Sequence, residues 1–310
     1  MRPVFTIIVP SYNNAGYLSS CVGSFSSKES SVEIIVVDDG STDDTQHVLA
    51  ELSKENPDIR VITQANGGVS SARNAGLREA TGRFVMFVDA DDRLFSEALN
   101  QISRNIGNYD EDIVVFTMIS EGHEMEQWKG RFEENRHYAA TDLIQRGYIR
   151  GSACGCMFRL DYLKESGVTF SNDLTMAEDT VFFACAIAAG ASVSFSDIRL
   201  YEVIPRNGSA SRIYDETFLH RYGKSLQAAR RLIPDRCVAD NTILTILMGI
   251  VNVAAKTGHS AKETEKICAV DSVLPLSVPV MIRHKWLVRV LNHDFSLFFA
   301  IKKLRDRFLP

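Results

Sequence analysis

The chain has 310 residues, which is enough for one large domain or two modest ones. With 45% hydrophobic and 24% charged residues it has an ordinary globular composition, which excludes a largely disordered or collagen-like chain. The formal net charge of −5 argues against general nucleic-acid binding, so we expect no nucleic-acid partner.

No apolar run reaches the roughly 18 residues of a membrane-spanning helix. Residues 1–3 lead directly into a predicted strand, so we expect no secretory leader. We therefore expect a cytoplasmic protein. The six cysteines are scattered, and only Cys154 and Cys156 lie close together. Because no second pair and no histidine follow at zinc spacing, we expect buried thiols rather than metal ligands.

The first third of the chain alternates between continuous apolar runs and stretches typical of helices. The predicted strands are residues 4–10, 32–38, 59–63 and 84–89, and the intervening helices are residues 15–27, 43–54 and 70–80. Strands buried on both faces and separated by helices of about a dozen residues indicate βαβ units. We therefore predict an α/β fold with a Rossmann-like, mostly parallel sheet flanked by helices.

The pattern changes beyond a fifth predicted strand at residues 113–119, and the chain becomes helical from residue 214. The helices predicted there are residues 216–232, 239–256 and 261–270. We therefore divide the chain into an α/β domain at residues 1–213, with halves at 1–118 and 119–213, and a C-terminal helical extension at 214–310.

Polar residues gather where the predicted parallel strands end. Residues 10–14 (PSYNN) end the first strand, residues 38–41 (DDGS) end the second, and residues 89–92 (DADD) end the fourth. The third crossover opens with residues 66–68 (NGG) and continues to Arg73. Because ligands of open parallel sheets bind beyond the carboxyl ends of the strands, we expect these loops to form one site.

Asp89 and Asp91, separated by one alanine, suit a hard divalent cation. Mg²⁺ is usually held by one or two carboxylates and completes its coordination with water and substrate phosphates. The alternative is that Asp91 and Asp92 cap the helix that follows. The acidic and glycine-containing loops at the neighbouring strand ends favour the cation, so we predict Mn²⁺ or Mg²⁺ at Asp91 and Asp89.

Four segments, in this order, resemble the family 2 inverting glycosyltransferases, which have the GT-A fold. They are residues 6–13 (TIIVPSYN), 36–43 (VVDDGSTD), 66–76 (NGGVSSARNAG) and 87–92 (FVDADD). The resemblance thins towards residue 210 and is absent from the last third. It implies a metal-dependent, inverting transfer of a sugar from a nucleotide diphosphate donor, with UDP favoured by family frequency. The acceptor would be a hydroxyl of a glycan or lipid-linked acceptor in surface polysaccharide synthesis.

The resemblance also implies roles for single residues at the nucleotide site. Pro10 and Tyr12 would line the pocket for the base, and Asp39 would hydrogen-bond the edge of a uracil-like base. Arg73 would lie near the base and the phosphates. Asp89 would contact the ribose or the metal.

In the same family the residue matching Asp91 is the main protein ligand of the metal that bridges the diphosphate. A further match, residues 176–182 (MAEDTVF), resembles the Glu-Asp motif of the family, whose Asp is the usual catalytic base. We assign Asp179 as the base that takes the proton of the acceptor hydroxyl, and Glu178 as a supporting carboxylate of the acceptor site. The alternative is a pair of solvated carboxylates at a helix start.

Two looser matches follow the same family pattern. Residues 201–211 look like the segment that often closes over the diphosphate, which makes Arg206 a candidate for stabilising the leaving-group charge; a plain surface loop is the alternative. Residues 151–160 fall where family members place a strand under the acceptor pocket. Their small side chains would either admit the acceptor or only allow tight packing.

The last segment, residues 278–310, carries seven Lys and Arg residues against two Asp. Its apolar residues fall roughly on one helical face: Leu287, Val290, Leu291, Phe298, Ile301, Leu304 and Phe308. A basic amphipathic segment of this kind can lie in a membrane interface. The prediction of a peripheral contact with the inner face of the membrane competes with a helix packed on the enzyme.

Two other functions compete with glycosyl transfer. A catalytically degenerate nucleotide-sugar-binding module would retain the fold, but the intact Asp39, Asp91 and Asp179 argue against it. A nucleotidyltransferase would need a glycine-rich, arginine-bearing loop after the first strand, where this chain has residues 11–14 (SYNN). The absence of a GxGxxG motif at the same place opposes a dehydrogenase.

Overall fold

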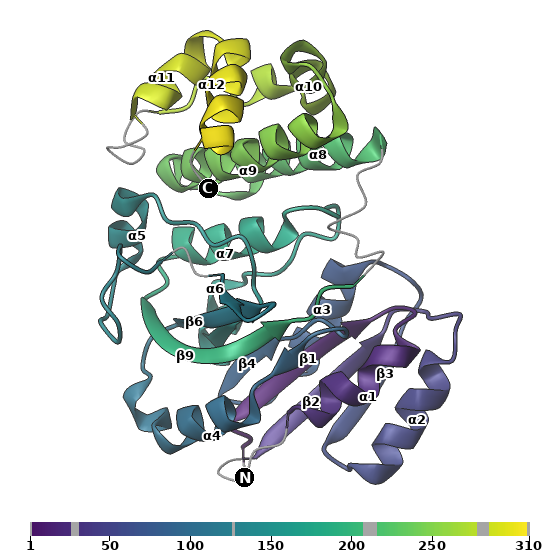
Figure 1. The fold of residues 1–310 in the computed structure, drawn as a ribbon. Coiled ribbons are helices and arrows are strands. Elements are labelled where there is room, and N and C mark those ends of the chain that lie inside the picture. The colour runs from purple at the N-terminus through teal and green to yellow at the C-terminus, as the bar shows by residue number, and fades with distance from the viewer. Residues whose placement is uncertain (1, 26–30, 126–127, 207–215, 278–284, 309–310) are drawn as a thin grey trace. The chain divides into compact units, whose positions relative to one another are not determined.

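The computed structural model describes residues 2–25, 31–125, 128–206, 216–277 and 285–308, without the side chains of 216, 285–287 and 303–308 (Figure 1). These residues form two compact units. The sheet unit comprises the described residues of 1–138, 153–172 and 191–206. The helical unit comprises those of 139–152, 173–190 and 207–310.

The first half of the sheet unit is a parallel sheet with the strand order β3-β2-β1-β4. The strands are β1 (Phe5–Ser11), β2 (Val32–Asp38), β3 (Ile59–Thr63) and β4 (Phe84–Phe87). The helices between them are α1 (Ala15–Gly23), α2 (Thr45–Glu55) and α3 (Val69–Glu79). Every residue of β1 and β4 is buried, as the continuous apolar runs predict. The predicted βαβ units are confirmed.

The second half of the sheet is mixed. The strand β8 (Cys156–Arg159) is antiparallel to β4 and to β6 (Ile113–Ser120), and β9 (Val193–Val203) runs parallel to β6. Two short strands, β5 (Arg93–Leu94) and β7 (His123–Glu124), pair antiparallel with β9 and β6. Two helices, α4 (Ser96–Arg104) and α6 (Leu160–Ser166), and the 3₁₀ turn η1 (Ile106–Asn108) complete this unit.

Two glycines allow the backbone to approach β1 closely. A Cβ added to Gly76 of α3 would lie only 2.4 Å from Cγ2 of Ile8. A Cβ on Gly82 would lie 2.7 Å from the backbone nitrogen of Thr6, whose Oγ1 accepts a hydrogen bond from the Gly82 N–H at 2.9 Å. Only glycine fits where real Cβ atoms would overlap, so these residues set how closely α3 and the start of β4 pack on β1.

The helical unit is built around α9 (Arg236–Thr257), which contacts α5, α7, α8, α10 and α12 (Figure 1). The other elements are α5 (Ala140–Arg146), α7 (Glu178–Ala188), α8 (Glu216–Leu232), α10 (Ala261–Cys268), η2 (Val270–Ser272), α11 (Lys285–His293) and α12 (Phe295–Phe308). By length and composition α9 could cross a membrane, contrary to the expectation that no segment would. However, 72% of its most apolar window is buried inside the protein, as in a core helix.

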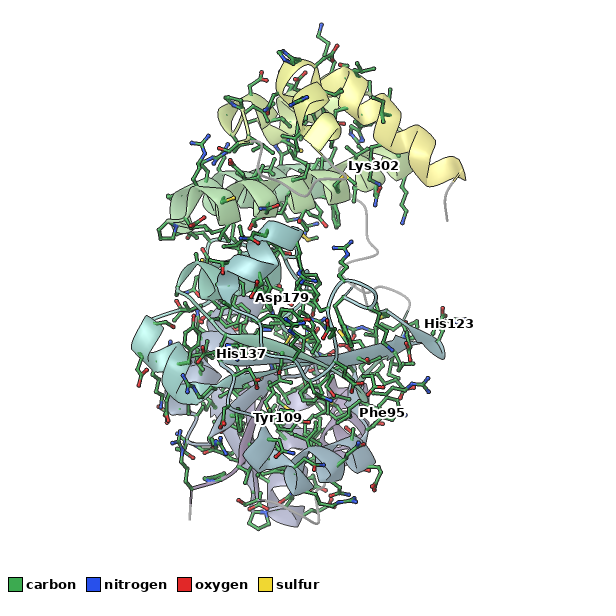
Figure 2. The ribbon with its side chains drawn as sticks, turned by 90° about the vertical axis from the view of Figure 1, so that its left-hand side faces the viewer. Phe95, Tyr109, His123, His137, Asp179 and Lys302 are labelled. Atoms are coloured by element: carbon green, nitrogen blue, oxygen red, sulfur yellow. The ribbon has the colours of Figure 1, made fainter. Side chains whose placement is uncertain are left out.

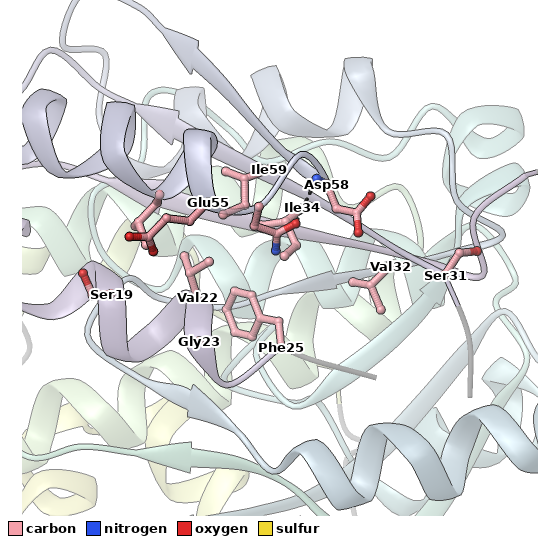
Figure 3. Close-up of a pocket in the computed structure, with 12 residues that line it drawn as sticks. Ser19, Val22, Gly23, Phe25, Ser31, Val32, Ile34, Glu55, Asp58 and Ile59 are labelled. Atoms are coloured by element: carbon pink, nitrogen blue, oxygen red, sulfur yellow. Dashed lines mark hydrogen bonds between the residues drawn. The ribbon is translucent and has the colours of Figure 1, made fainter. Parts of the chain in front are cut away.

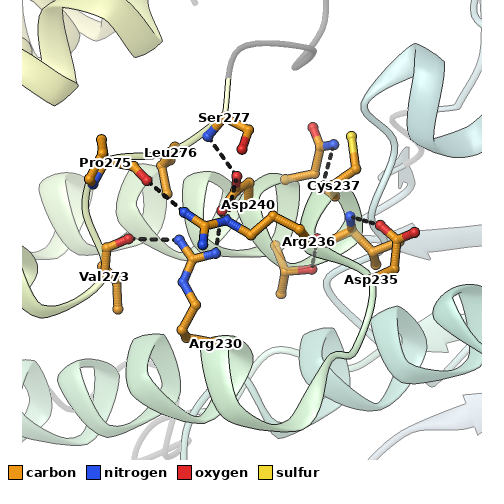
Figure 4. Close-up of polar contacts among 12 residues, drawn as sticks. Arg230, Asp235, Arg236, Cys237, Asp240, Val273, Pro275, Leu276 and Ser277 are labelled. Carbon is orange, nitrogen blue, oxygen red and sulfur yellow. Dashed lines mark hydrogen bonds and ion pairs between the residues drawn. The ribbon is translucent and has the colours of Figure 1, made fainter.

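A buried ionic network joins α8, α9 and the segment that follows α10 (Figure 4). Asp240, only 1% exposed, pairs with Arg230 at 2.5 Å and with Arg236 at 3.4 Å. The two guanidinium groups also donate to the carbonyls of Val273 (2.7 Å) and Pro275 (3.0 Å). All these donors converge on one carboxylate and two carbonyls, so the network fixes the chain after η2 against α8 and α9.

The C-terminal segment forms two helices, α11 and α12, which are separated at Asp294, so its apolar residues do not share the face of one continuous helix. Asp294 Oδ1 accepts a hydrogen bond from the Leu297 N–H at 3.0 Å, which caps the new helix start. The buried apolar side chains of these helices are Val288, Leu291, Phe295, Phe298 and Phe299. In the described residues this face packs inside the helical unit.

The predicted domain boundary near residue 213 falls in the segment 207–215, which lies outside the described residues. The two compact units cross that boundary, because the helical unit also includes residues 139–152 and 173–190. The division into 1–213 and 214–310 stays a prediction.

Candidate active site

The loops after β1 and β2 are tied together by side-chain hydrogen bonds. Asn13, in a left-handed conformation with φ of 53°, donates its N–H to Ser41 Oγ at 2.9 Å. Its side-chain oxygen accepts the Thr42 N–H at 2.8 Å. Of the two residues predicted to line the base pocket, Pro10 is buried in β1, whereas Tyr12 is 46% exposed beside these loops. Tyr12 is therefore the one available to a ligand in solution.

Asp39 is almost fully buried and holds the loop that opens α3. Its carboxylate accepts hydrogen bonds from Gln64 Nε2 (2.7 Å), from the Gly67 N–H (2.9 Å) and from the Gly68 N–H (2.7 Å). A carboxylate offers about four acceptor positions, so three protein donors leave room for one more hydrogen bond. The predicted contact of Asp39 with a base edge stays a prediction, and the structure adds a loop-fixing role.

Arg73, in the first half of α3, is also buried, with 3% of its side chain exposed. Its Nη2 lies 2.9 Å from Asp89 Oδ1, and its guanidinium lies over the ring of Phe170 at 5.2 Å. An arginine held from both sides in this way has little rotamer freedom. Arg73 therefore fixes the position of Asp89, whose side chain remains 40% exposed.

Asp92 is bound from β9 and does not act as a helix cap. Its Oδ2 accepts the Tyr201 hydroxyl at 2.7 Å, and its Oδ1 accepts the Ile204 N–H at 2.8 Å. The helix α4 begins at Ser96 without any side-chain cap. The interpretation of Asp91 and Asp92 as caps is therefore wrong. Burial raises the pKa of Asp92 to about 7, against the lowering effect of these two hydrogen bonds.

Asp91 is paired with Arg206, which follows β9. Arg206 Nε lies 2.5 Å from Asp91 Oδ2. The guanidinium also donates to Asn14 Oδ1 at 3.1 Å and lies over the ring of Tyr17 at 5.1 Å. Burial and the nearby Asp89 raise the pKa of Asp91, whereas Arg206 lowers it. These contacts place the Arg206 guanidinium beside the acidic loop after β4.

The acidic loop fits a divalent cation. The described part of the chain contains no group of three or more His, Cys, Asp and Glu side chains placed to hold a metal. A cation that takes one or two carboxylates and completes its coordination with substrate phosphates does not need such a group. The charge of Asp91 is disfavoured by burial and by Asp89, and a cationic guanidinium already lies against it. Asp91 and Asp89 are thus the carboxylates of this loop that a cation would use, and each is paired with an arginine.

Glu178 and Asp179 form the first turn of α7, in the helical unit. Asp179 is labelled in Figure 2. Ala177, just before them, has a left-handed backbone with φ of 53°, which is uncommon for a residue with a Cβ. Ser152 Oγ lies 3.4 Å from Asp179 Oδ2. Carboxylates are also stabilised at helix starts by the backbone dipole, so their place in α7 fits both interpretations made from the sequence.

The predicted site residues therefore fall into two groups. The sheet unit carries Pro10, Tyr12, Asp39, Arg73, Asp89, Asp91 and Arg206 at the carboxyl ends of β1, β2 and β4 or bonded to the loops there. The helical unit carries Glu178 and Asp179. Tyr201 was not predicted to have a role. It binds the acidic loop from a strand distant in sequence, and nothing in its local pattern indicates that contact.

A pocket of the sheet unit lies between α1, α2 and the starts of β2 and β3 (Figure 3). The predicted site residues of this unit lie at the other, carboxyl ends of the parallel strands. The lining of the pocket includes Val22, Phe25, Ile34 and Ile59. None of the predicted site residues lines it. Phe25 and Ser31 line it and flank residues 26–30 in sequence, which lie outside the described chain, so we assign it no role.

The parallel half-sheet with an acidic loop after β4, continued by a mixed half-sheet, defines a protein of the GT-A class. The sequence profile described as "Glycosyl transferase family 2" matches residues 6–167. This match covers more than half of the chain, which therefore belongs to glycosyl transferase family 2.

Relatives in this family carry related names. The "Uncharacterized glycosyltransferase EpsJ" of Bacillus subtilis is 29% identical over 213 residues, which cover 65% of this chain and 61% of that protein. The "Poly(ribitol-phosphate) beta-N-acetylglucosaminyltransferase TarS" of Staphylococcus aureus strain MW2 is 29% identical over 210 residues, covering 66% of this chain and 36% of that protein. The match thus spans less than two thirds of each relative.

Solved structures support the fold. TarS residues 1–349 from S. aureus in complex with UDP superimpose with a TM-score of 0.69 at 22% identity, covering 99% of this chain and 91% of that one. The mannosyltransferase PcManGT of Pyrobaculum calidifontis, in complex with GDP-Man and Mn²⁺, gives 0.55 at 17% identity, covering 99% and 88%. The predicted α/β GT-A fold is confirmed.

Proposed function

We propose that this chain is an inverting glycosyltransferase that moves a sugar from a UDP-sugar to a hydroxyl of a glycan or lipid-linked acceptor in surface polysaccharide synthesis. The observation that carries the proposal is the acidic loop Asp89–Asp92 between two arginines, Arg73 and Arg206. Such a loop suits a diphosphate held by a cation. The names of relatives support the acceptor class, since three of them are named as poly(ribitol-phosphate) glycosyltransferases. A TarS complex with UDP-GlcNAc supports a UDP-sugar.

We further propose that Asp91 and Asp89 hold Mn²⁺ or Mg²⁺. When bound, the cation would neutralise charge on the diphosphate and so favour its departure. Arg73 keeps Asp89 oriented, and the Arg206 guanidinium provides a second positive charge beside the same loop. The proposed metal-dependence thus relies on residues that are already paired with cationic side chains.

In this proposal Asp179 takes the proton of the acceptor hydroxyl while that oxygen forms the bond to the anomeric carbon. The nucleoside diphosphate leaves from the opposite face, which inverts the configuration. Ser152 would help to orient the Asp179 carboxylate, and Glu178 would hold the acceptor. General-base catalysis contributes about 10²–10⁴-fold in rate, or about 3–5 kcal/mol.

Titration calorimetry on the whole chain tests the donor site. We expect UDP-GlcNAc or another UDP-sugar to bind in the presence of Mn²⁺, and Asp91→Asn to abolish the metal-dependent part of the affinity. Asp110→Asn, a change at a side chain that is 90% exposed, is the matched control and should bind normally. Failure of UDP-, GDP- and dTDP-sugars to bind with either ion would refute the proposed function.

Turnover then separates an enzyme from a degenerate binding module. We expect Asp179→Asn to lower UDP release at least about 100-fold while donor affinity stays within twofold. A wild-type chain that binds UDP-sugars but releases no UDP would instead support the binding module. Unchanged turnover in Asp179→Asn would remove this residue from the mechanism.

We also propose a cytoplasmic location at the inner face of the membrane, where a lipid-linked acceptor would be available. The buried apolar side chains of α11 and α12 favour packing on the enzyme over insertion. A membrane contact of residues 278–310 would therefore depend on their basic residues, each worth about 1 kcal/mol near anionic lipid.

A further inference from the structure

A cavity of about 320 Å³ lies in the helical unit beside the first turn of α7. One wall is Gly151 and residues 176–180, which include Glu178 and Asp179. The other wall comes from the C-terminal helices: Tyr222 of α8, and Thr245, Ile246 and Gly249 of α9. The family resemblance is absent from these helices, so it assigns no role to this wall.

We propose that this cavity binds the acceptor through a single hydroxyl-rich unit, a sugar ring or a polyol, and that Tyr222, Thr245 and Gly249 select that unit. The inference rests on the proposed function, because it takes Asp179 as the base that the acceptor hydroxyl must reach. It adds the chemical class of the acceptor group and the residues that discriminate it.

The size of the cavity limits its occupant. Ligand pockets in proteins have volumes of about 300–1,000 Å³, and this cavity is at the lower end of that range. One sugar or polyol unit suits it better than a segment of several units. The rest of a longer acceptor would have to remain outside the cavity.

The charges of the lining residues indicate a neutral, hydroxyl-bearing group. Of the described residues that line it, Glu178 and Asp179 are the charged side chains, and none is Lys, Arg or His. Carboxylates accept hydrogen bonds from hydroxyl groups but repel a phosphate. An acceptor that carries phosphates would therefore place its sugar or polyol part here.

The α8–α9 wall supplies an aromatic ring and a hydroxyl group. The Tyr222 ring packs against Phe218, with centroids 5.3 Å apart, which restrains its orientation. An aromatic ring of this kind offers an apolar surface with a polar tip. Thr245 donates its hydroxyl to the Asn241 carbonyl at 2.9 Å, so its oxygen can still accept a hydrogen bond.

Gly249 determines how much space remains between α9 and the Tyr222 ring in the cavity. It lies one turn after Thr245 on the same face of α9, in a helix interior where glycine costs about 0.5–1 kcal/mol relative to alanine. A Cβ added there would lie 3.8 Å from the nearest atoms of the Tyr222 ring, which is ordinary contact. Alanine therefore fits, whereas a longer side chain would occupy the space between α9 and Tyr222.

The experiment measures how the enzyme divides its donor between water and an added acceptor. The whole chain is incubated with Mn²⁺ and the UDP-sugar that binds best in calorimetry, with ribitol, methyl β-glucopyranoside or methyl β-N-acetylglucosaminide as the probe. Free sugar reports hydrolysis, and the new glycoside reports transfer. Their ratio does not depend on how much of a variant is folded.

We expect at least one probe to divert donor from hydrolysis to transfer in the wild-type chain. Gly249→Leu should lower the transfer-to-hydrolysis ratio about tenfold or more, because it fills the acceptor space, and leave the donor KM unchanged. Gly249→Ala adds only one methyl group, which the structure accommodates, and should lower the ratio less than Gly249→Leu does. Tyr222→Ala should also lower the ratio.

Two results overturn the inference while leaving the proposed function intact. The first is donor hydrolysis that no probe diverts. The second is a ratio in Gly249→Leu equal to that of Gly249→Ala. A wild-type chain that neither binds nor hydrolyses any UDP-sugar overturns the proposed function itself, and the acceptor pocket with it.

Discussion

Arg206 is paired with the Asp91 carboxylate, which the proposed metal would also need. Its Nε lies 2.5 Å from Asp91 Oδ2, while Asn14 and the Tyr17 ring hold the rest of the guanidinium. A divalent cation at Asp91 would compete with this ion pair. The same guanidinium, once displaced, would lie close to a diphosphate held by that cation. Arg206 is therefore expected to oppose metal binding in the free protein and to assist catalysis.

Replacing this arginine should move two measurements in opposite directions. We expect Arg206→Gln to tighten Mn²⁺ binding in the absence of nucleotide by about fivefold, the worth of a partly exposed ion pair, and to slow UDP release about 100-fold. Calorimetry with Mn²⁺ and a UDP-release assay measure the two effects. Arg104→Gln, which removes an exposed pair with Glu97, is the control. Unchanged Mn²⁺ affinity would contradict the competition.

Asp92 should make stability depend on pH. Its pKa is about 7 in the folded protein and 3.8 in an ordinary environment, so between these values the folded state binds the extra proton. The contribution of protonated Asp92 to the free energy of unfolding is therefore complete below pH 3.8 and is lost as the pH rises towards and through 7. At 1.36 kcal/mol per unit, ionised Asp92 costs up to about 4 kcal/mol.

Asp92→Asn removes this titration. We expect the variant to gain stability relative to wild type between pH 5 and pH 8, measured by urea unfolding in EDTA. The exposed Asp110→Asn should show no such trend. A stability difference that is the same at both pH values would show that Asp92 does not titrate in this range.

At the scale of elements, local patterns predicted the first half of the sheet well. The bounds of β2 and β3 agree with the prediction, because both strands are rich in Val and Ile and end at polar turns, although Glu33 and Arg60 interrupt the two apolar runs. The helix α1 ends at Gly23, short of the predicted residue 27, where Ser24 and Phe25 form a turn. Periodicity is weakest at such ends, where side-chain and turn hydrogen bonds decide.

Local sequence patterns did not predict the strand pairing in the mixed half of the sheet. The strand β9 contains Ser194, Ser196 and Asp197 and pairs with β6 through an irregular register, so its run is neither continuous nor regularly alternating. Its pairing partner is far away in sequence. The contacts that complete the candidate site, of Tyr201 and Arg206 with the acidic loop, depend on this pairing and could be located only by the resemblance or by the structure.

The α8–α9 pairing should depend on Asp240. We expect Asp240→Asn to lower the free energy of unfolding by about 3 kcal/mol, because it leaves Arg230 and Arg236 without their buried counter-ion. Asp235→Asn is the control: Asp235 caps α9 through the Val238 N–H at 2.9 Å, and asparagine caps equally well. Urea unfolding followed by circular dichroism compares the two. Equal stabilities would show that the network contributes little.

At the scale of the whole molecule, the two units are interleaved along the chain. The segments 139–152 and 173–190 belong to the helical unit although most of that unit follows residue 206. Composition and periodicity indicate where the chain becomes helical. They do not indicate that α5 and α7, within the α/β region of the sequence, pack against α9.

Substitutions in the C-terminal segment, residues 278–310, can distinguish packing on the enzyme from membrane binding. If α12 is a packed element, Phe298→Ala should lower the free energy of unfolding by about 3–5 kcal/mol, since the side chain is fully buried. A triple variant changes the basic residues Lys303, Arg305 and Arg307 to Gln. Co-sedimentation with vesicles containing anionic lipid tests the alternative. Vesicle binding by the wild-type chain that is lost in the triple variant would establish a peripheral contact, and equal binding would exclude one through these charges.

The residues predicted to bind the donor and those predicted to bind the acceptor belong to different units. Every residue predicted to contact the nucleotide or its metal lies in the sheet unit, whereas Glu178, Asp179 and the cavity beside them lie in the helical unit. If both sets of roles hold, donor choice depends on residues of the sheet unit and acceptor choice on residues of the helical unit. Chimaeras that exchange α8 and α9 between relatives would then redirect the product without changing the activated sugar that is consumed.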